Sequence, residues 1–180
     1  MTNENIEKRS RKLAHLLRHD KDYDFDNGFR CVSDLVKNHN YTMELLEVLV
    51  VTDAKNRYSF SPDKTKIRAN YGHSKWIKID WEEGTPPDVL YHGTAEGAVE
   101  SITQTGIESR SRTFVHLSVD EEMAVTVGAR HKKNGKPCIL VVNAKQMHED
   151  GIKFYLSGCS SVWLTDYVAP KYIEQVVRCS

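Results

Sequence analysis

The sequence has no long apolar run. Its two longest apolar stretches are residues 45–51 (LLEVLVV) and 138–142 (CILVV). Both are far shorter than the roughly 20 residues that a membrane-spanning helix needs. The N-terminal segment MTNENIEKRSRK is charged and is not followed by the apolar region of a signal peptide. We therefore expect a protein without a membrane span that is located in the cytoplasm.

The sequence also lacks paired cysteines. Its four cysteines are scattered along the chain: Cys31, Cys138, Cys159 and Cys179. A zinc knuckle or a dithiol redox motif needs a CxxC pair, so these residues are expected to be reduced thiols. His15 and His19 have the spacing of two metal ligands on one helix, but the Glu of an HExxH motif is missing and Arg18 adjoins. We expect no metal site.

Neither sign of charge is in excess, because 25 basic residues balance 25 acidic residues. Bulk charge therefore gives no argument for a nucleic-acid partner. One local run is basic, with no acidic residue between Asp63 and Asp80. Its members are Lys64, Lys66, Arg68, Lys75 and Lys78. Both a solvated strand face and an RNA-binding patch would explain this run.

The first 80 residues combine helical patterns with a hairpin pattern. Apolar residues between positions 6 and 19 recur at the helical period and predict a first helix. Ser33 is expected to cap a short helix over 34–38, and Thr42 a longer helix that follows it. Segments 57–60 and 66–69 alternate polar and apolar residues on either side of a turn, which predicts a hairpin. This order favours a winged-helix-like lobe over residues 1–80.

The remaining sequence predicts a second lobe rich in strands. Residues 81–88 (WEEGTPPD) contain Gly, Pro and acidic residues, as a linker between lobes does. Helices are expected over 95–105, closed by Gly106, and after a capping box formed by Ser118 and Glu121. Short strands are expected at 89–92, 114–117, 139–143, 154–156 and 162–164. The fold class is therefore α+β, with a β-rich lobe over residues 89–180.

Three segments place arginine close to histidine: LRH (17–19), IRANYGHS (67–74) and GARH (128–131). The planar guanidinium group matches phosphate oxygens, and imidazole transfers protons near neutral pH. Each segment alone is explained as well by a surface ion pair or a helix end. Together in space they would form a site for phosphoryl chemistry.

Two further motifs allow other functions. His92 and Thr94 form one HxT motif, and His116 and Ser118 form an HxS motif. Such a pair is typical of two-histidine phosphoesterases, in which one imidazole acts as base and the other as acid. The short spacing between the motifs argues against that fold. A third interpretation is a winged-helix nucleic-acid-binding module without catalysis, whose second lobe senses NAD or ADP-ribose.

An ordered set of motifs resembles the tRNA 2'-phosphotransferase (KptA) family over about residues 8–175. The motifs are LLRH, Gly28 ahead of VSDL, RYSFS, KIRANYGHS, PPDVLYHGT, TFVHLS, VGAR and GCSSVWLTD. The family commonly has Pro after RH and Trp after its early Gly. This chain has Asp20 and Phe29 at those places, which leaves the Arg and His residues intact.

The resemblance implies an enzyme with a winged-helix RNA lobe and an ADP-ribosyltransferase-like lobe that uses NAD as co-substrate. In this family an internal RNA 2'-phosphate attacks the nicotinamide-bearing ribose carbon of NAD and expels nicotinamide. The ribose 2''-hydroxyl of the RNA 2'-phospho-ADP-ribose intermediate then attacks the phosphate. The products are RNA with a free 2'-hydroxyl, ADP-ribose 1'',2''-cyclic phosphate and nicotinamide.

The resemblance also assigns site residues. The catalytic residues would be Arg18, His19, Arg68 and Arg130, with the arginines of both lobes on one phosphate. The NAD-binding residues would be His92, Gly93, Thr94, His116 and Ser118, where Gly93 would let the backbone approach the ligand closely. The RNA-binding residues would be Lys66, Asn70, His73, Ser74 and Lys75. A phosphomonoester dianion needs positioning rather than deprotonation, which arginines provide.

Overall fold

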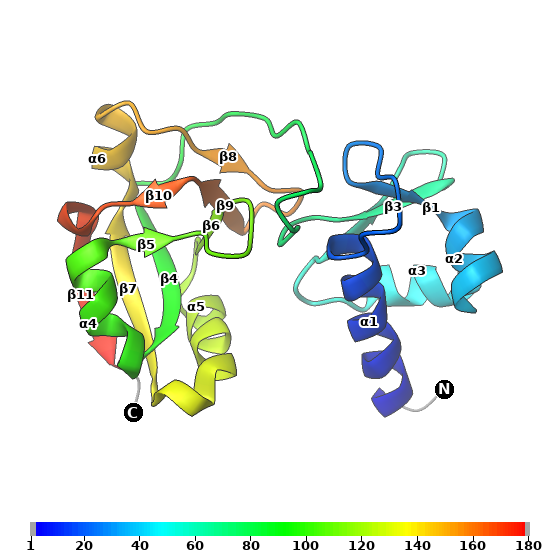
Figure 1. Cartoon of the computed structure of the whole chain (residues 1–180), viewed down its shortest axis with the longest axis horizontal. Helices are drawn as coiled ribbons and strands as arrows, with labels where there is room; N and C mark the ends of the chain where they lie inside the picture. Colours follow the sequence, from blue (N-terminus) through cyan, green and yellow to red (C-terminus); the bar gives the residue numbers. More distant parts are fainter. Residues whose placement is uncertain (1–2, 179–180) are drawn as a thin grey trace. The chain divides into compact units, whose positions relative to one another are not determined.

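The structure is a computed structural model that describes residues 3–178, without the side chains of Asn3, His131, Lys132 and Arg178. The chain divides into two compact units, Met1–Asp80 and Trp81–Ser180 (Figure 1). Each unit contains helices and antiparallel sheets, which confirms the expected mixture of the two. None of the helices described combines the length and the apolar character needed to cross a bilayer. Cys31, Cys138 and Cys159 are free thiols, and Cys179 lies outside the described residues.

The first unit contains three helices around a small sheet. Its elements are α1 (Asn3–Arg18), β1 (Phe29–Cys31), α2 (Val32–His39), α3 (Met43–Val51), β2 (Tyr58–Phe60) and β3 (Lys66–Ala69). The strands pair antiparallel in the order β1-β3-β2. Leu13 and Leu17 of α1 are fully buried and belong to the same apolar cluster as Ile67 of β3. The predicted first helix and the predicted hairpin are thus confirmed.

The two helix caps predicted in this unit have different outcomes. Thr42 caps α3 as expected, because its side chain accepts a hydrogen bond of 3.2 Å from the backbone N–H of Leu45. The prediction for Ser33 is wrong. Strand β1 runs directly into α2, so the N-cap is Cys31 and Ser33 lies within the first turn.

The second unit is built on one large antiparallel sheet. Its elements are β4 (Val89–Ala95), α4 (Glu96–Thr105), β5 (Ile107–Glu108), β6 (Val115–Ser118), α5 (Glu121–Gly128), the 3-10 helix η1 (Ala129–Asn134), β7 (Pro137–Asn143), α6 (Ala144–Glu149), β8 (Tyr155–Leu156), β9 (Val162–Thr165), β10 (Tyr167–Val168), the 3-10 helix η2 (Pro170–Tyr172) and β11 (Ile173–Arg178). Six strands form the order β11-β7-β4-β6-β9-β8, and β10 pairs with β5 separately. The five predicted strands are all present.

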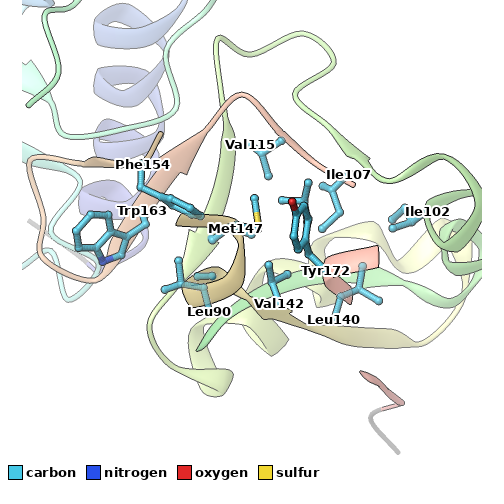
Figure 2. Close-up of a cluster of buried hydrophobic side chains, with 13 residues drawn as sticks. Leu90, Ile102, Ile107, Val115, Leu140, Val142, Met147, Phe154, Trp163 and Tyr172 are labelled. Carbon is cyan, nitrogen blue, oxygen red and sulfur yellow. The ribbon is translucent and has the colours of Figure 1, made fainter. Parts of the chain in front are cut away.

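The apolar core of this unit lies on one face of the central strands. Leu90 of β4 and the alternating residues Leu140 and Val142 of β7 belong to this core, as the period of two along a strand requires. Figure 2 shows Phe154 and Trp163 at one end of the cluster and Ile102 at the other. The core therefore spans residues that are widely separated along the chain.

The two helix caps predicted in the second unit also have different outcomes. Gly106 ends α4 with a φ of 85°, a left-handed value that favours glycine, as predicted. Ser118 does not cap α5, so that prediction is wrong. Strand β6 extends through Ser118, which pairs with Val162, and the N-cap is Asp120. The Asp120 carboxylate accepts a hydrogen bond of 2.8 Å from the N–H of Met123.

The segment expected to link the lobes lies along β8. The N–H of Gly84 donates to the carbonyl of Phe154 at 2.9 Å, and Glu83 forms an isolated antiparallel bridge with Tyr155. Glu83 also forms an ion pair of 2.8 Å with Lys153. These bonds attach the middle of the segment to the second unit.

Helix α5 packs closely against β4 because both contribute glycine at the contact. A Cβ atom added to Gly93 would lie 1.9 Å from the carbonyl oxygen of Ala124, and one added to Gly128 would lie 2.5 Å from that of Thr94. Either distance is inside van der Waals contact with backbone. The missing side chain of Gly93 therefore serves the packing of α5 on β4, and its expected role beside NAD stays a prediction.

We predict that Gly93→Ala lowers the free energy of unfolding by about 2 kcal/mol, because the new methyl group must displace the α5 backbone. Urea unfolding of the full chain at pH 7 measures this. Gly151→Ala is the matched control for adding a methyl group at a glycine, since a Cβ there meets nothing within 4 Å, although its φ of 87° adds some strain. A Gly93→Ala protein as stable as the unmodified chain would contradict the close packing.

Candidate functional site

The end of α1 brings together the first two of the residues assigned to catalysis. Arg18 is the last residue of α1, and His19 follows it. The N–H of Ser74 donates to the carbonyl of Arg18 at 3.0 Å, and the Ser74 hydroxyl shares a hydrogen bond of 2.8 Å with Nδ1 of His19. Ser74 is only 5% exposed. One serine therefore positions both residues, and its bond to Nδ1 sets the orientation of the imidazole ring.

The same loop holds the guanidinium of Arg18. Its central carbon lies 5.0 Å from the centre of the Tyr71 ring, within cation–π range. The Tyr71 hydroxyl donates to the carbonyl of Lys55 at 3.1 Å. Gly72 has a φ of 88°, a left-handed conformation, in the stretch that connects Tyr71 to Ser74. We call Arg18, His19, Tyr71 and Ser74 the Arg18 cluster.

Arg68 lies on β3, and not all hydrogen-bond donors of its guanidinium have a partner within the described residues. Its neighbours Ile67 and Ala69 are fully buried in the core, so Arg68 lies on the opposite face of the sheet. The guanidinium stacks on Phe29, its cross-strand partner, at 4.7 Å. Its Nε is buried and has no hydrogen-bond partner within the described residues, and burial lowers the pKa of the side chain. Such a group is suited to receive an anion.

Three of the residues expected to contact RNA lie in the interior of the first unit. Asn70, His73 and Ser74 are 3%, 4% and 5% exposed. The amide of Asn70 donates to the carbonyl of Asn56 at 2.7 Å and accepts from the hydroxyl of Ser59 at 2.6 Å. Ser74 positions the Arg18 cluster. Asn70 and Ser74 thus form hydrogen bonds within the fold, and the expected role of all three residues toward RNA stays a prediction.

The two lysines of the same group lie outside the core. Lys75 is exposed, and Lys66 forms an ion pair of 2.7 Å with Asp26. Both partners of that pair are largely in solvent, so the pair contributes little to stability. For both lysines, the expected contact with RNA stays a prediction.

A buried arginine that the sequence analysis did not identify supports the Arg18 cluster. The Arg30 side chain is 3% exposed and forms ion pairs of 2.6 Å with both Asp20 and Asp34. It also donates to the carbonyl of Leu16 at 3.2 Å and to Nε2 of His39 at 2.7 Å. Leu16 and Asp20 flank the Arg18–His19 pair in sequence, so Arg30 holds that pair from both sides. The signal that could have found Arg30 is an arginine that follows four aspartates at positions 20–26 and precedes Asp34 by one helical turn.

The Arg30 network changes the pKa values of its members. Burial and the positive charge of Arg30 lower the pKa of His39. Because Arg30 donates to Nε2, that nitrogen carries no proton and His39 is neutral in this arrangement. Burial acts to raise the pKa values of Asp20 and Asp34, but the hydrogen bonds from Arg30 and from neighbouring amides outweigh it and lower both.

These directions predict a loss of stability in acid in two stages. A pKa lowered by folding contributes stability above the unfolded value and loses it as pH falls through the folded value. For His39 the loss begins below about pH 6.5, and for the two aspartates below about pH 4. We expect His39→Gln to flatten the dependence of the unfolding free energy on pH between 6.5 and 5. Urea titrations at a series of pH values measure this, and parallel curves for the two proteins would contradict it.

In the second unit, the residues assigned to NAD lie on the neighbouring strands β4 and β6. These strands share a single registered pair, Tyr91 with Ser118. Beyond it, β4 from His92 to Ala95 pairs with β7 alone among the described strands. Nδ1 of His92 donates to the carbonyl of His116 at 3.2 Å and so crosses between the two strands.

The other members of this group differ in exposure. His92 and His116 are half-buried, whereas Thr94 and Ser118 are 6% and 7% exposed. Arg130 lies on η1, directly after α5, and its side chain is exposed. Helix η1 packs against β4 and β7. Arg130 therefore belongs to the same unit as the residues assigned to NAD.

Among the residues that the structure describes, no three His, Cys, Asp or Glu side chains are grouped as metal ligands. The rings of His15 and His19 lie 5.6 Å apart and are tilted relative to each other. His19 uses Nδ1 toward Ser74.

Comparisons with known proteins cover almost the whole of this chain. The sequence model of the RNA 2'-phosphotransferase, Tpt1 / KptA family matches residues 4–167. The chain belongs to this family. The match includes all four residues that the resemblance assigned to catalysis and all five that it assigned to NAD.

Individual members of the family are similar over most or all of their lengths. A probable RNA 2'-phosphotransferase of Flavobacterium johnsoniae is 44% identical over 183 residues, which cover 96% of this chain and 98% of that protein. A protein of the same description from Nostoc punctiforme is 40% identical over 185 residues, covering 98% and 100%. Another from Fusobacterium nucleatum is 43% identical over 153 residues, covering 82% and 84%.

Proposed function

We propose that this chain removes an internal 2'-phosphate from RNA by transferring it to NAD. The products would be RNA with a free 2'-hydroxyl, ADP-ribose 1'',2''-cyclic phosphate and nicotinamide. The observation that carries the proposal is the family match over residues 4–167. The presence of Arg18, His19, Arg68 and Arg130 supports it, as does the partly satisfied guanidinium of Arg68.

In this proposal the first unit is a winged-helix-like RNA-binding lobe. Arg18 and Arg68 bind the 2'-phosphate through their guanidinium groups and orient it for attack. His19, whose ring orientation is set by Ser74, holds or moves a proton as the phosphate is transferred. Arg130 stabilises the negative charge that builds up on the phosphate. Lys66 and Lys75 would contact neighbouring phosphates of the RNA.

The second unit is, in this proposal, an ADP-ribosyltransferase-like lobe that holds NAD along β4 and β6. The residues fit this role because β4 has a strand partner on only one edge from His92 to Ala95. Backbone groups on its other edge can bind ribose hydroxyls. NAD supplies an activated ribose carbon with nicotinamide as leaving group. His116, Thr94 and Ser118 line the same two strands.

The two other functions considered from the sequence are less well supported. A two-histidine phosphoesterase presents both imidazoles to one phosphate. Here His92 and His116 are only 24 positions apart and lie on adjacent strands of one sheet, which does not match the two separate halves of that fold. The family match also favours a transferase over a binding module that has no catalytic activity.

The test is to incubate the protein with an oligoribonucleotide that carries one internal 2'-phosphate, with and without NAD. We expect loss of the phosphate from the RNA only when NAD is present. Mass spectrometry should then detect nicotinamide and ADP-ribose cyclic phosphate in equal amounts. Equal phosphate release without NAD would overturn the proposal, whereas NAD-independent opening of a 2',3'-cyclic phosphate end would favour the phosphoesterase.

A further inference from the structure

We propose that Trp76 and Lys21 form a binding site for an unstacked RNA base beside the Arg18 cluster. The inference rests on the proposed function, because the RNA is the substrate of that reaction. It adds a specificity site for the base of the phosphorylated nucleotide or of its immediate neighbour. Neither residue belongs to the set that the family resemblance assigned.

The indole of Trp76 is presented to solvent from an anchored turn. Its side chain is 50% exposed, whereas Ser74 and Ile77 on either side are buried at 5% and 4%. The N–H of Ile77 donates to the carbonyl of Ser74 at 3.0 Å, which closes the turn. An exposed aromatic ring on a rigid support provides a stacking surface with little loss of conformational entropy on binding.

Positive charge surrounds this ring. Nζ of Lys21 lies 5.1 Å from the centre of the Trp76 ring. Lys75 and Lys78 are exposed on the same turn. A stacking aromatic side chain flanked by cationic groups is the usual recognition element for single-stranded nucleic acid, where the base stacks on the ring and ammonium groups bind phosphates.

Trp76 and Lys21 each lie close in sequence to a member of the Arg18 cluster. Trp76 follows Ser74 by two residues, and Lys21 follows His19 by two residues. Ser74 and His19 are themselves joined by a hydrogen bond of 2.8 Å. Two residues of extended chain span at most about 7 Å. The Trp76–Lys21 pair is therefore close enough to bind a base while the Arg18 cluster binds the 2'-phosphate of the same or the next nucleotide.

The decisive experiment measures RNA binding without NAD, so that no transfer occurs. The probes are short oligoribonucleotides with one internal 2'-phosphate, either complete or with one abasic position at the phosphorylated nucleotide or on either side of it. We expect one of the three abasic positions to weaken binding to the unmodified protein by about tenfold. Equal affinity for all four RNAs would overturn the proposal, and this arm needs no protein variant.

The same titration with Trp76→Ala assigns the effect to the indole. This variant should bind the complete RNA about tenfold more weakly and lose no further affinity at the sensitive abasic position. Trp76→Phe should recover most of the affinity, and Val51→Ala, an exposed apolar control on α3 in the same unit, should bind as the unmodified protein does. Abasic losses of the same size in Trp76→Ala and in the unmodified protein would overturn the assignment.

Addition of NAD to the unmodified protein tests the proposed function separately. If phosphate is transferred but the RNA binds equally well with and without an abasic position, only the base site is overturned. Binding that depends on the base and on Trp76, without NAD-dependent transfer, overturns the proposed reaction and supports the base site. The two failures are thus distinguishable.

Discussion

Replacing Arg68 by alanine is expected to lower the rate of phosphate transfer by roughly a hundredfold without destabilising the protein. The rate effect follows because one charge-assisted contact to the transferred phosphate stabilises the transition state by about 3 kcal/mol. The stability effect follows from the environment of the side chain. Its Nε is buried without a hydrogen-bond partner and burial lowers its pKa, so the folded protein gains little from this charge.

Single-turnover kinetics with saturating NAD, together with urea unfolding, measure the two effects on the same samples. Lys153→Ala is the control, because Lys153 is an exposed cation that is paired with Glu83 and has no assigned role in binding or catalysis. We expect it to change the rate less than threefold, as an exposed ion pair contributes little. Arg68→Lys should remain well below the unmodified rate, since an ammonium group lacks the planar fork. A full rate in Arg68→Ala would remove this residue from the site.

Replacing Arg30 by methionine is expected to lower the free energy of unfolding by about 3–5 kcal/mol. The substitution leaves the Asp20 and Asp34 carboxylates without the guanidinium that pairs with both at 2.6 Å. Removal of one partner from a buried ion-pair network has this cost, because the remaining charges lose their compensation. The loss should also slow phosphate transfer, since Arg30 holds the segment that carries Arg18 and His19.

Urea unfolding at pH 7 tests this prediction. Adding Asp20→Asn and Asp34→Asn to the Arg30→Met protein should restore part of the stability, because the uncompensated charges are removed. Lys64→Met is the control, as Lys64 and Glu47 form an ion pair that is largely exposed, and we expect a change below about 1 kcal/mol. If Arg30→Met is no less stable than Lys64→Met, Arg30 does not have the supporting role described above.

The success and failure of the helix predictions have a common physical basis. Thr42 was identified as a cap because its bond to Leu45 is formed by residues three apart in sequence. Ser33 and Ser118 failed because strand pairing decides where α2 and α5 begin. Ser118 pairs with Val162, which is far from it in sequence, and β6 therefore continues past the expected start of the helix.

The short strands were missed for a related reason. Strand β1 has three residues, too few for alternation to be visible, and it exists through pairing with β3. Strands β5 and β10 have two residues each and form only with each other. Pairing between distant segments contributes most of the stability of such strands, and local patterns do not record it.

For the candidate site, the residue types could be identified from the sequence but their partners could not. The motifs identified Arg18, His19, Arg68 and Arg130, together with the histidines of β4 and β6. The bond between His19 and Ser74 and that between His92 and the carbonyl of His116 join residues 55 and 24 positions apart. Sequence patterns also suggested RNA contacts for Asn70, which the fold uses internally.

The sequence by itself determined the periodic helices, the hairpin of the first unit, the caps at Thr42 and Gly106, and the family to which the chain belongs. These properties depend on side-chain chemistry and on neighbours within a few residues. The tertiary structure decided which polar groups are buried, that Arg30 supports the end of α1, and that Gly93 lies against α5. It decided them because burial, ion pairing and steric exclusion arise only when segments distant in sequence pack together.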